Sequence, residues 1–139
     1  MAEELARNRY GVVIAHDQPR YLELGWLPST SNMSDEDFMT GLMMLASEAE
    51  AVGTRAILVD ATHFGHGFED FDNTMARRDQ QVIPRYNEAG VERFAFLMPP
   101  DFGGPTAESG AEPQVDGPTA GFSTQWFIER TDAVDWLAG

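Results

Sequence analysis

The sequence contains no cysteine and no lysine. Without cysteine the chain can form no disulfide, no thiolate nucleophile and no Cys-ligated zinc site, and a cytoplasmic location is the simplest expectation. All nine basic residues are arginine, and 23 acidic residues give a formal net charge of −14. A negative field of this size repels phosphate backbones and anionic membrane surfaces, so we expect no nucleic-acid partner.

Long apolar runs are also absent. No run approaches the roughly 20 residues that a membrane-spanning helix needs, so we expect no membrane insertion. The chain also lacks a basic start followed by an apolar core, so it does not resemble a signal peptide. Its 139 residues, of which 42% are hydrophobic, suit one domain that buries its core without a metal or disulfide.

The first half of the sequence predicts a hairpin and a helix. Residues 1–8 are polar and are expected to be flexible, whereas 10–15 and 20–26 have the β-branched and alternating patterns of strands. The short link between these strands predicts an antiparallel hairpin. Ser34 and the acids after it are typical of a helix start, apolar residues then recur at steps of three and four, and Gly53 ends a helix over 34–52.

The second half alternates strands with helices. Residues 55–60 read as a buried strand, and a second helix is expected from Phe68 to about Gly90, with a kink at Pro84. Strands are predicted at 92–98 and 122–128, and a closing helix at 131–137. We therefore expect a single α/β domain with a mixed, mostly parallel five-stranded sheet, in the order β-β-α-β-α-β-β-α, covered by helices.

A Pro- and Gly-rich segment at 99–121 interrupts this pattern. It contains five prolines, five glycines and four acids, without a base. A segment of this length without regular structure is commonly a binding loop, a lid or disordered.

The loop after the strand at 55–60 is the first candidate site, because open α/β sheets place ligands at the carboxyl ends of their strands. His63 and His66 could ligate a metal together with nearby carboxylates, and Asp60 could orient His63 in a catalytic role. The spacing of the two histidines matches no specific zinc signature, however. We therefore expect neither a metal nor a cofactor, and no enzyme; a metal-dependent enzyme at these histidines is the weakest alternative.

Aromatic residues at strand ends and in loops suggest a second kind of site. A pocket for an apolar small molecule or lipid, beneath the 99–121 segment, could be formed by Trp26, Phe64, Phe68, Phe102 and Trp126, with His63 and His66 beside it. The competing interpretation places these aromatic rings in the core.

Methionines on the first helix suggest an interaction surface. Met39 and Met43 lie beside the apolar stripe of that helix, and exposed methionine is typical of adaptable contact surfaces. Together with Glu69 and Asp72 at the start of the second helix, they form a candidate face for a protein partner or a homodimer.

The whole pattern resembles the STAS-like bacterial proteins, which are related in fold to the anti-sigma-factor antagonists. The resemblance rests on the hairpin ending at Trp26, the helix 34–52, the strand 57–60, the helix through Pro84 to Gly90, the strand 94–99 and the closing segment 132–137. It implies a regulatory or protein-interaction module, and the related architecture of CRAL–TRIO domains implies lipid binding as an alternative.

In the anti-sigma-factor antagonists a phosphorylatable serine opens the second helix. Counted from Asp60, the corresponding position in this sequence falls on Phe68 and Glu69, where there is no hydroxyl group. Phosphorylation there would place about two negative charges at a helix start, but this chain lacks the acceptor.

Overall fold

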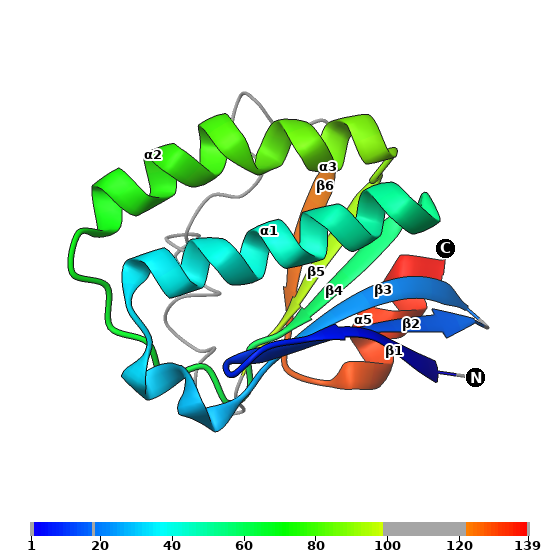
Figure 1. Cartoon of the computed structure of the whole chain (residues 1–139). Helices are drawn as coiled ribbons and strands as arrows, with labels where there is room; N and C mark the ends of the chain where they lie inside the picture. Colours follow the sequence, from blue (N-terminus) through cyan, green and yellow to red (C-terminus); the bar gives the residue numbers. More distant parts are fainter. Residues whose placement is uncertain (1, 18, 99–121, 139) are drawn as a thin grey trace.

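The computed structural model describes residues 2–17, 19–98 and 122–138, which form a mixed α/β fold around a single sheet (Figure 1). Its strands are β1 (Ala2–Arg7), β2 (Gly11–Asp17), β3 (Arg20–Trp26), β4 (Ala56–Asp60), β5 (Arg93–Leu97) and β6 (Ser123–Phe127). The helices are α1 (Asp35–Val52), α2 (Phe71–Gln81), α3 (Ile83–Ala89) and α5 (Arg130–Ala138), and a 3-10 turn, η1, spans Pro28–Asn32. The strands lie side by side in chain order; β1, β2 and β3 are antiparallel, and β3 to β6 are parallel.

The prediction of five strands was wrong, because six are present in the described part of the chain. Residues 2–7 were expected to be flexible but form β1. This strand lies at the edge of the sheet and pairs with β2, so that Arg7 is opposite Val12. The turn into β2 is fixed by Asn8, whose side-chain oxygen accepts hydrogen bonds from the backbone N–H groups of Tyr10 and Gly11. The strand was missed because it is mostly exposed and polar, so that pairing with β2, rather than an apolar pattern, orders it.

Helix α1 matches its prediction at both ends. Ser34 accepts a hydrogen bond from the Asp37 backbone N–H at 3.1 Å, and the Asp37 carboxylate accepts one from the Ser34 N–H, also at 3.1 Å. Gly53 ends the helix with a φ of 67°, in the left-handed region that glycine adopts at no steric cost.

The second predicted helix starts later than expected and is divided in two. Asp70 caps α2 by accepting a hydrogen bond from the Asn73 N–H at 3.1 Å, so the helix begins at Phe71 and not at Phe68. Val82 separates α2 from α3, and Pro84 occupies the first turn of α3. Proline is tolerated in a first turn because the N–H groups there have no carbonyl partner within the helix, so the N–H that proline lacks is not missed.

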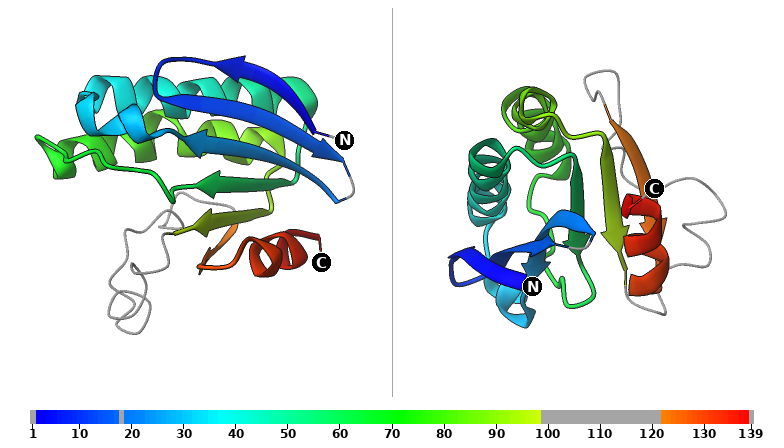
Figure 2. Two further views of the ribbon diagram at one scale, coloured as in Figure 1. Left: turned by 90° about the horizontal axis from the view of Figure 1, so that it is seen from below. Right: turned by 90° about the vertical axis from the view of Figure 1, so that its right-hand side faces the viewer.

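The sheet carries helices on both faces (Figure 2). Helices α1, α2 and α3 lie on one face, where alternate strand residues such as Leu24, Ile57 and Phe94 build the larger core. Helix α5 lies on the other face and packs Ala133 and Leu137 into a smaller core. The central strands β4 and β5 are therefore largely buried on both sides, as their nearly continuous apolar sequences predict.

Two further expectations concern membrane insertion and the Pro- and Gly-rich segment. Among the described residues, no helix combines the length and apolar character needed to cross a bilayer. The predicted segment 99–121, with Phe102, lies outside the described residues.

Candidate functional site

An apolar pocket of about 140 Å³ lies at the carboxyl ends of the parallel strands. This is the edge at which open α/β sheets generally bind ligands. We call it the aromatic pocket; it is lined by Trp26, Phe38, Val59, Ala61, Phe64, Phe68, Phe71, Met75, Arg78, Phe96, Met98 and Trp126.

One wall of the aromatic pocket is a cluster of rings from the end of β3, the first turn of α1 and the loop between β4 and α2. The ring of Phe38 stacks on Trp26, with centroids 5.6 Å apart. Phe64 meets Trp26 edge-on at 5.4 Å, and Phe68 meets Phe38 edge-on at 4.9 Å. Stacked and edge-to-face contacts of this kind hold each ring in one orientation, so this wall is preformed.

The opposite wall comes from β5 and β6. Phe96 and Trp126 are direct neighbours across these parallel strands, and their rings stack with centroids 4.4 Å apart. At the rim, the first residue of α2, Phe71, leaves 44% of its surface exposed and meets Phe68 edge-on. The pocket thus joins the buried core to an exposed aromatic side chain.

Close packing of α1 against Trp26 depends on a glycine. A Cβ atom on Gly41 would come within 2.5 Å of the Trp26 ring, far inside van der Waals contact. Glycine at this position therefore lets the helix backbone approach the indole that lines the pocket. The sequence pattern did not single out Gly41, because glycine is not one of the apolar residues whose spacing marks the buried face of a helix.

Asp35 holds the loop that supplies two of the pocket rings. Its carboxylate accepts hydrogen bonds from the His66 ring at 2.8 Å, from the backbone N–H groups of Glu69 and Asp70 at 3.1 and 2.9 Å, and from the Thr74 hydroxyl at 3.1 Å. The hydrogen bond from the Asp70 N–H is the largest cause that lowers the Asp35 pKa to about 2. From sequence, Asp35 was read only as an acid at a helix start.

The structure places the two histidines in different surroundings. The His66 side chain is 1% exposed, pairs with Asp35 and packs against Phe38 and Phe68, which makes it a satisfied core histidine. His63 is exposed, and neither histidine belongs to the pocket lining. Within the described ranges, no group of three His, Asp or Glu side chains is arranged to hold a metal ion.

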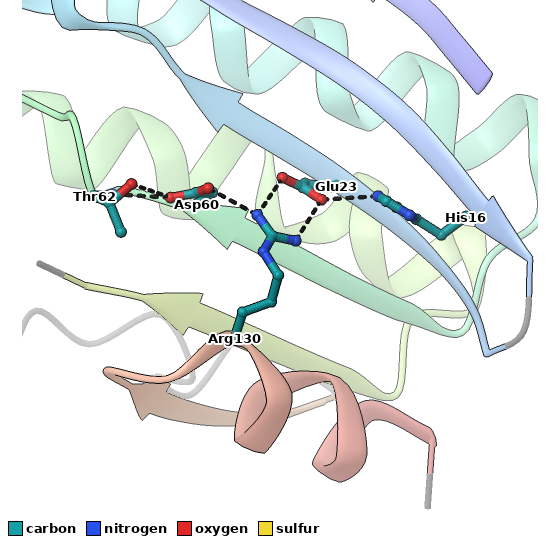
Figure 3. A network of polar contacts seen from close by, with 5 residues as sticks. All are labelled: His16, Glu23, Asp60, Thr62 and Arg130. Carbon is teal, nitrogen blue, oxygen red and sulfur yellow. Dashed lines mark hydrogen bonds and ion pairs between the residues drawn. The ribbon is translucent and has the colours of Figure 1, made fainter. Parts of the chain in front are cut away.

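A polar network lies on the other face of the sheet, under α5 (Figure 3). Glu23 of β3 is 5% exposed, and each of its carboxylate oxygens accepts a hydrogen bond from Arg130 at 3.0 Å. His16 lies 2.8 Å from the same carboxylate, and Arg130 also reaches Asp60 at 2.9 Å. The hydrogen bonds to Glu23 are the largest cause that raises the pKa of Arg130.

This network fixes α5 to the sheet. Arg130 is the first residue of α5, while Glu23 and Asp60 belong to β3 and β4, so the guanidinium joins three elements. Asp60 in turn accepts hydrogen bonds from the backbone N–H and hydroxyl of Thr62, at 3.0 and 2.6 Å. Asp60 thus contacts Thr62 and Arg130 in place of the predicted partner His63. The role of the network is structural, since it joins α5 to two strands.

The structure brings part of the predicted ligand site together. Trp26, Phe64, Phe68 and Trp126 line the aromatic pocket, whereas His63 and His66 do not. Sequence reasoning missed Phe38, Phe71 and Met75, which reach the pocket from helices, and Phe96, which reaches it from β5.

The predicted interaction surface is only partly exposed. Met39 is 2% exposed within the core, so it cannot belong to a contact surface. Met43 is partly buried, and its sulfur accepts a hydrogen bond from Arg85 at 3.3 Å. Glu69 and Asp72 are exposed. Met39 was misplaced because α1 packs against both the sheet and α3, which widens its buried face beyond one stripe.

No protein-family model, curated protein or solved structure matches the chain. The resemblance to STAS-like proteins therefore stays a prediction.

Proposed function

We propose that this domain is a non-enzymatic binding module that takes a compact apolar molecule into the aromatic pocket. The observation that carries the proposal is the lining itself: of the described residues that form it, Arg78 alone is charged, and the others are aromatic or aliphatic. Apolar clefts with few polar groups are the usual form of small-molecule sites.

The size of the pocket limits the ligand. Its volume of about 140 Å³ is close to the ~150 Å³ of apolar protein cavities that admit a benzene ring. A single aromatic ring or a short branched alkyl group matches this volume, whereas a whole lipid does not. We therefore propose a ring-sized ligand, or the ring-sized end of a larger molecule.

Folding leaves the apolar surface of several pocket rings incompletely buried. Phe64, Phe68 and Trp126 are only partly buried, and Phe71 is exposed. A ligand that covers these rings gains about 25 cal/mol for each Å² of apolar surface removed from water. Because the walls are already fixed by ring–ring contacts, little ordering energy opposes binding.

Native mass spectrometry of protein purified without added ligand, followed by titration with indole and with octanoate, tests this proposal. We expect retention of an apolar compound, or saturable binding of at least one probe that raises the melting temperature. If neither compound binds and purified protein carries nothing, the proposal is wrong.

Two matched variants locate the binding site. Phe71 and Ile128 are both 44% exposed, but Phe71 lines the pocket and Ile128 does not. Phe71→Ala should weaken probe binding about fivefold or more, because it removes aromatic contact from the rim, whereas Ile128→Ala should leave binding unchanged. Equal effects of the two substitutions would contradict a site in the aromatic pocket.

Self-association through the surface that includes Met43, Glu69 and Asp72 stays a separate prediction. Light scattering across a concentration series tests it directly. A mass that remains that of a monomer at every concentration would exclude the homodimer.

A further inference from the structure

A second pocket, of about 450 Å³, lies at the amino ends of the parallel strands, the edge opposite to the aromatic pocket. We call it the arginine pocket; the described residues that line it are Pro19, Arg20, Arg55, Ala56, Glu92, Arg93, Leu137 and Ala138. Its volume falls within the roughly 300–1,000 Å³ of typical small-molecule sites.

The sheet topology brings three arginines to this pocket. Arg20 is the first residue of β3, Arg55 immediately precedes β4, and Arg93 is the first residue of β5. Because β3, β4 and β5 are parallel neighbours, their first residues meet at one edge. Three of the nine arginines of a protein with a net charge of −14 are thus gathered around one cavity.

Two of these guanidinium groups donate to neutral partners. Arg20 donates to the backbone oxygen of Val52 at 2.6 Å, and Arg93 donates to that of Trp136. These carbonyls belong to the ends of α1 and α5, so the contacts also satisfy helix ends. A carbonyl orients a guanidinium without cancelling its charge, and a guanidinium has five N–H donors, so each arginine retains donors for a ligand.

The third guanidinium is paired loosely. Arg55 donates to Glu92 at 3.0 Å, but the two side chains are 76% and 60% exposed. Exposed ion pairs of this kind contribute little to the stability of the fold. The described lining therefore has three cationic groups and one carboxylate, a local charge of about +2. Asp17 lies opposite Arg20 in strand register but does not line the pocket.

The large negative charge of the whole protein does not exclude an anion here. At physiological ionic strength the Debye length is about 8 Å, so acids on distant surfaces are largely screened. Helix capping explains the contacts to Val52 and Trp136 one at a time, but it gives no reason for Arg20, Arg55 and Arg93 to surround one cavity.

We infer that the arginine pocket binds a small multivalent anion, whose phosphate or carboxylate oxygens are held by Arg20, Arg55 and Arg93. Phosphate and carboxylate share the two-oxygen geometry that the guanidinium fork recognises. The inference is independent of the proposed function, because the two pockets share no residue.

Isothermal titration calorimetry with inorganic phosphate, and separately with citrate, tests the inference at an ionic strength held constant with chloride. We expect one of the two anions to bind with a Kd of about 1 mM or lower, and the stronger one identifies the class of ligand. If neither anion binds more tightly than about 10 mM, the inference is wrong.

Two glutamine variants that change the net charge equally provide the test and its control. Arg20→Gln should weaken anion binding about tenfold or more, whereas Arg7→Gln, which alters an exposed pair with Glu4 on β1, should change it less than about twofold. Equal weakening by both would show a response to net charge alone and would overturn the inference. Arg93→Gln should repeat the effect of Arg20→Gln at a separate position, and circular dichroism confirms that each variant is folded.

Discussion

The two edges of the parallel sheet differ in how their side chains are held. At the carboxyl edge, aromatic rings continue the core, as Trp26 and Phe38 show, and the nearby Arg130 is bound by a buried carboxylate. At the amino edge, Arg20 and Arg55 are exposed, and the carboxylate that pairs with Arg55 is exposed as well. The same topological rule gathers side chains at both edges, but the rings of the carboxyl edge are held by apolar packing, whereas the arginines of the amino edge are held by polar contacts.

This difference predicts that substitutions at the carboxyl edge affect stability strongly, whereas those at the amino edge affect mainly binding. The two arginine–glutamate pairs provide the sharpest comparison, because the chemistry is the same and the burial differs.

Replacement of Arg130 should have the largest effect on stability. Arg130→Met leaves Glu23 buried without its cationic partner, although His16 remains in contact, and should lower the free energy of unfolding by about 2–3 kcal/mol. Arg55→Met, at the exposed pair with Glu92, should leave the free energy of unfolding nearly unchanged, because solvent screens this pair. Urea denaturation followed by circular dichroism measures both, and similar losses for the two variants would remove the distinction between the edges.

Asp35 should give a smaller effect that depends on pH. Its pKa in the folded protein is lowered to about 2, below its unfolded value near 4, so the carboxylate stabilises the fold above about pH 4. This stabilisation is lost as the pH falls through 4 toward 2. Asp35→Asn should therefore lower the melting temperature at pH 7, and the difference from the wild type should shrink in acid. A difference that stays constant from pH 7 to pH 2 would contradict this role for Asp35.

Gly41→Ala should have the smallest of the three effects. A methyl group there overlaps the Trp26 ring, and overpacking of this kind costs about 1–3 kcal/mol, but alanine is a better helix former than glycine by about 1 kcal/mol. We expect a net loss of about 1 kcal/mol, together with weaker binding in the aromatic pocket, because Trp26 must move. A thermal melt and an indole titration measure the two effects, and a more stable protein with unchanged binding would show that the ring adapts freely.

Local chemistry made some parts of the fold predictable. Both ends of α1 follow from a serine cap and a glycine stop, which act within a few residues. Strand β1 was missed because its order comes from pairing with β2, and the start of α2 was misplaced because several acids compete to cap it.

The candidate sites depended more on tertiary structure. Aromatic residues at strand ends could be recognised from sequence, whereas Phe38 and Phe71 reach the pocket through helix packing. The arginine pocket was missed because each arginine reads as an ordinary surface residue. A signal was present, since an arginine lies at the start of each strand that borders this pocket, but it becomes visible only when the strands are aligned in parallel.

The order of the strands bears on how the protein folds during synthesis. Since each strand pairs with its predecessor in the chain, every new strand can add to a sheet edge that already exists. Contacts between segments close in sequence form quickly, and amino-terminal structure forms first on the ribosome. The contact between Arg130 and Glu23 joins residues 107 apart, so we expect it among the last to form. Docking of α5 would then complete a sheet whose first strands are already assembled.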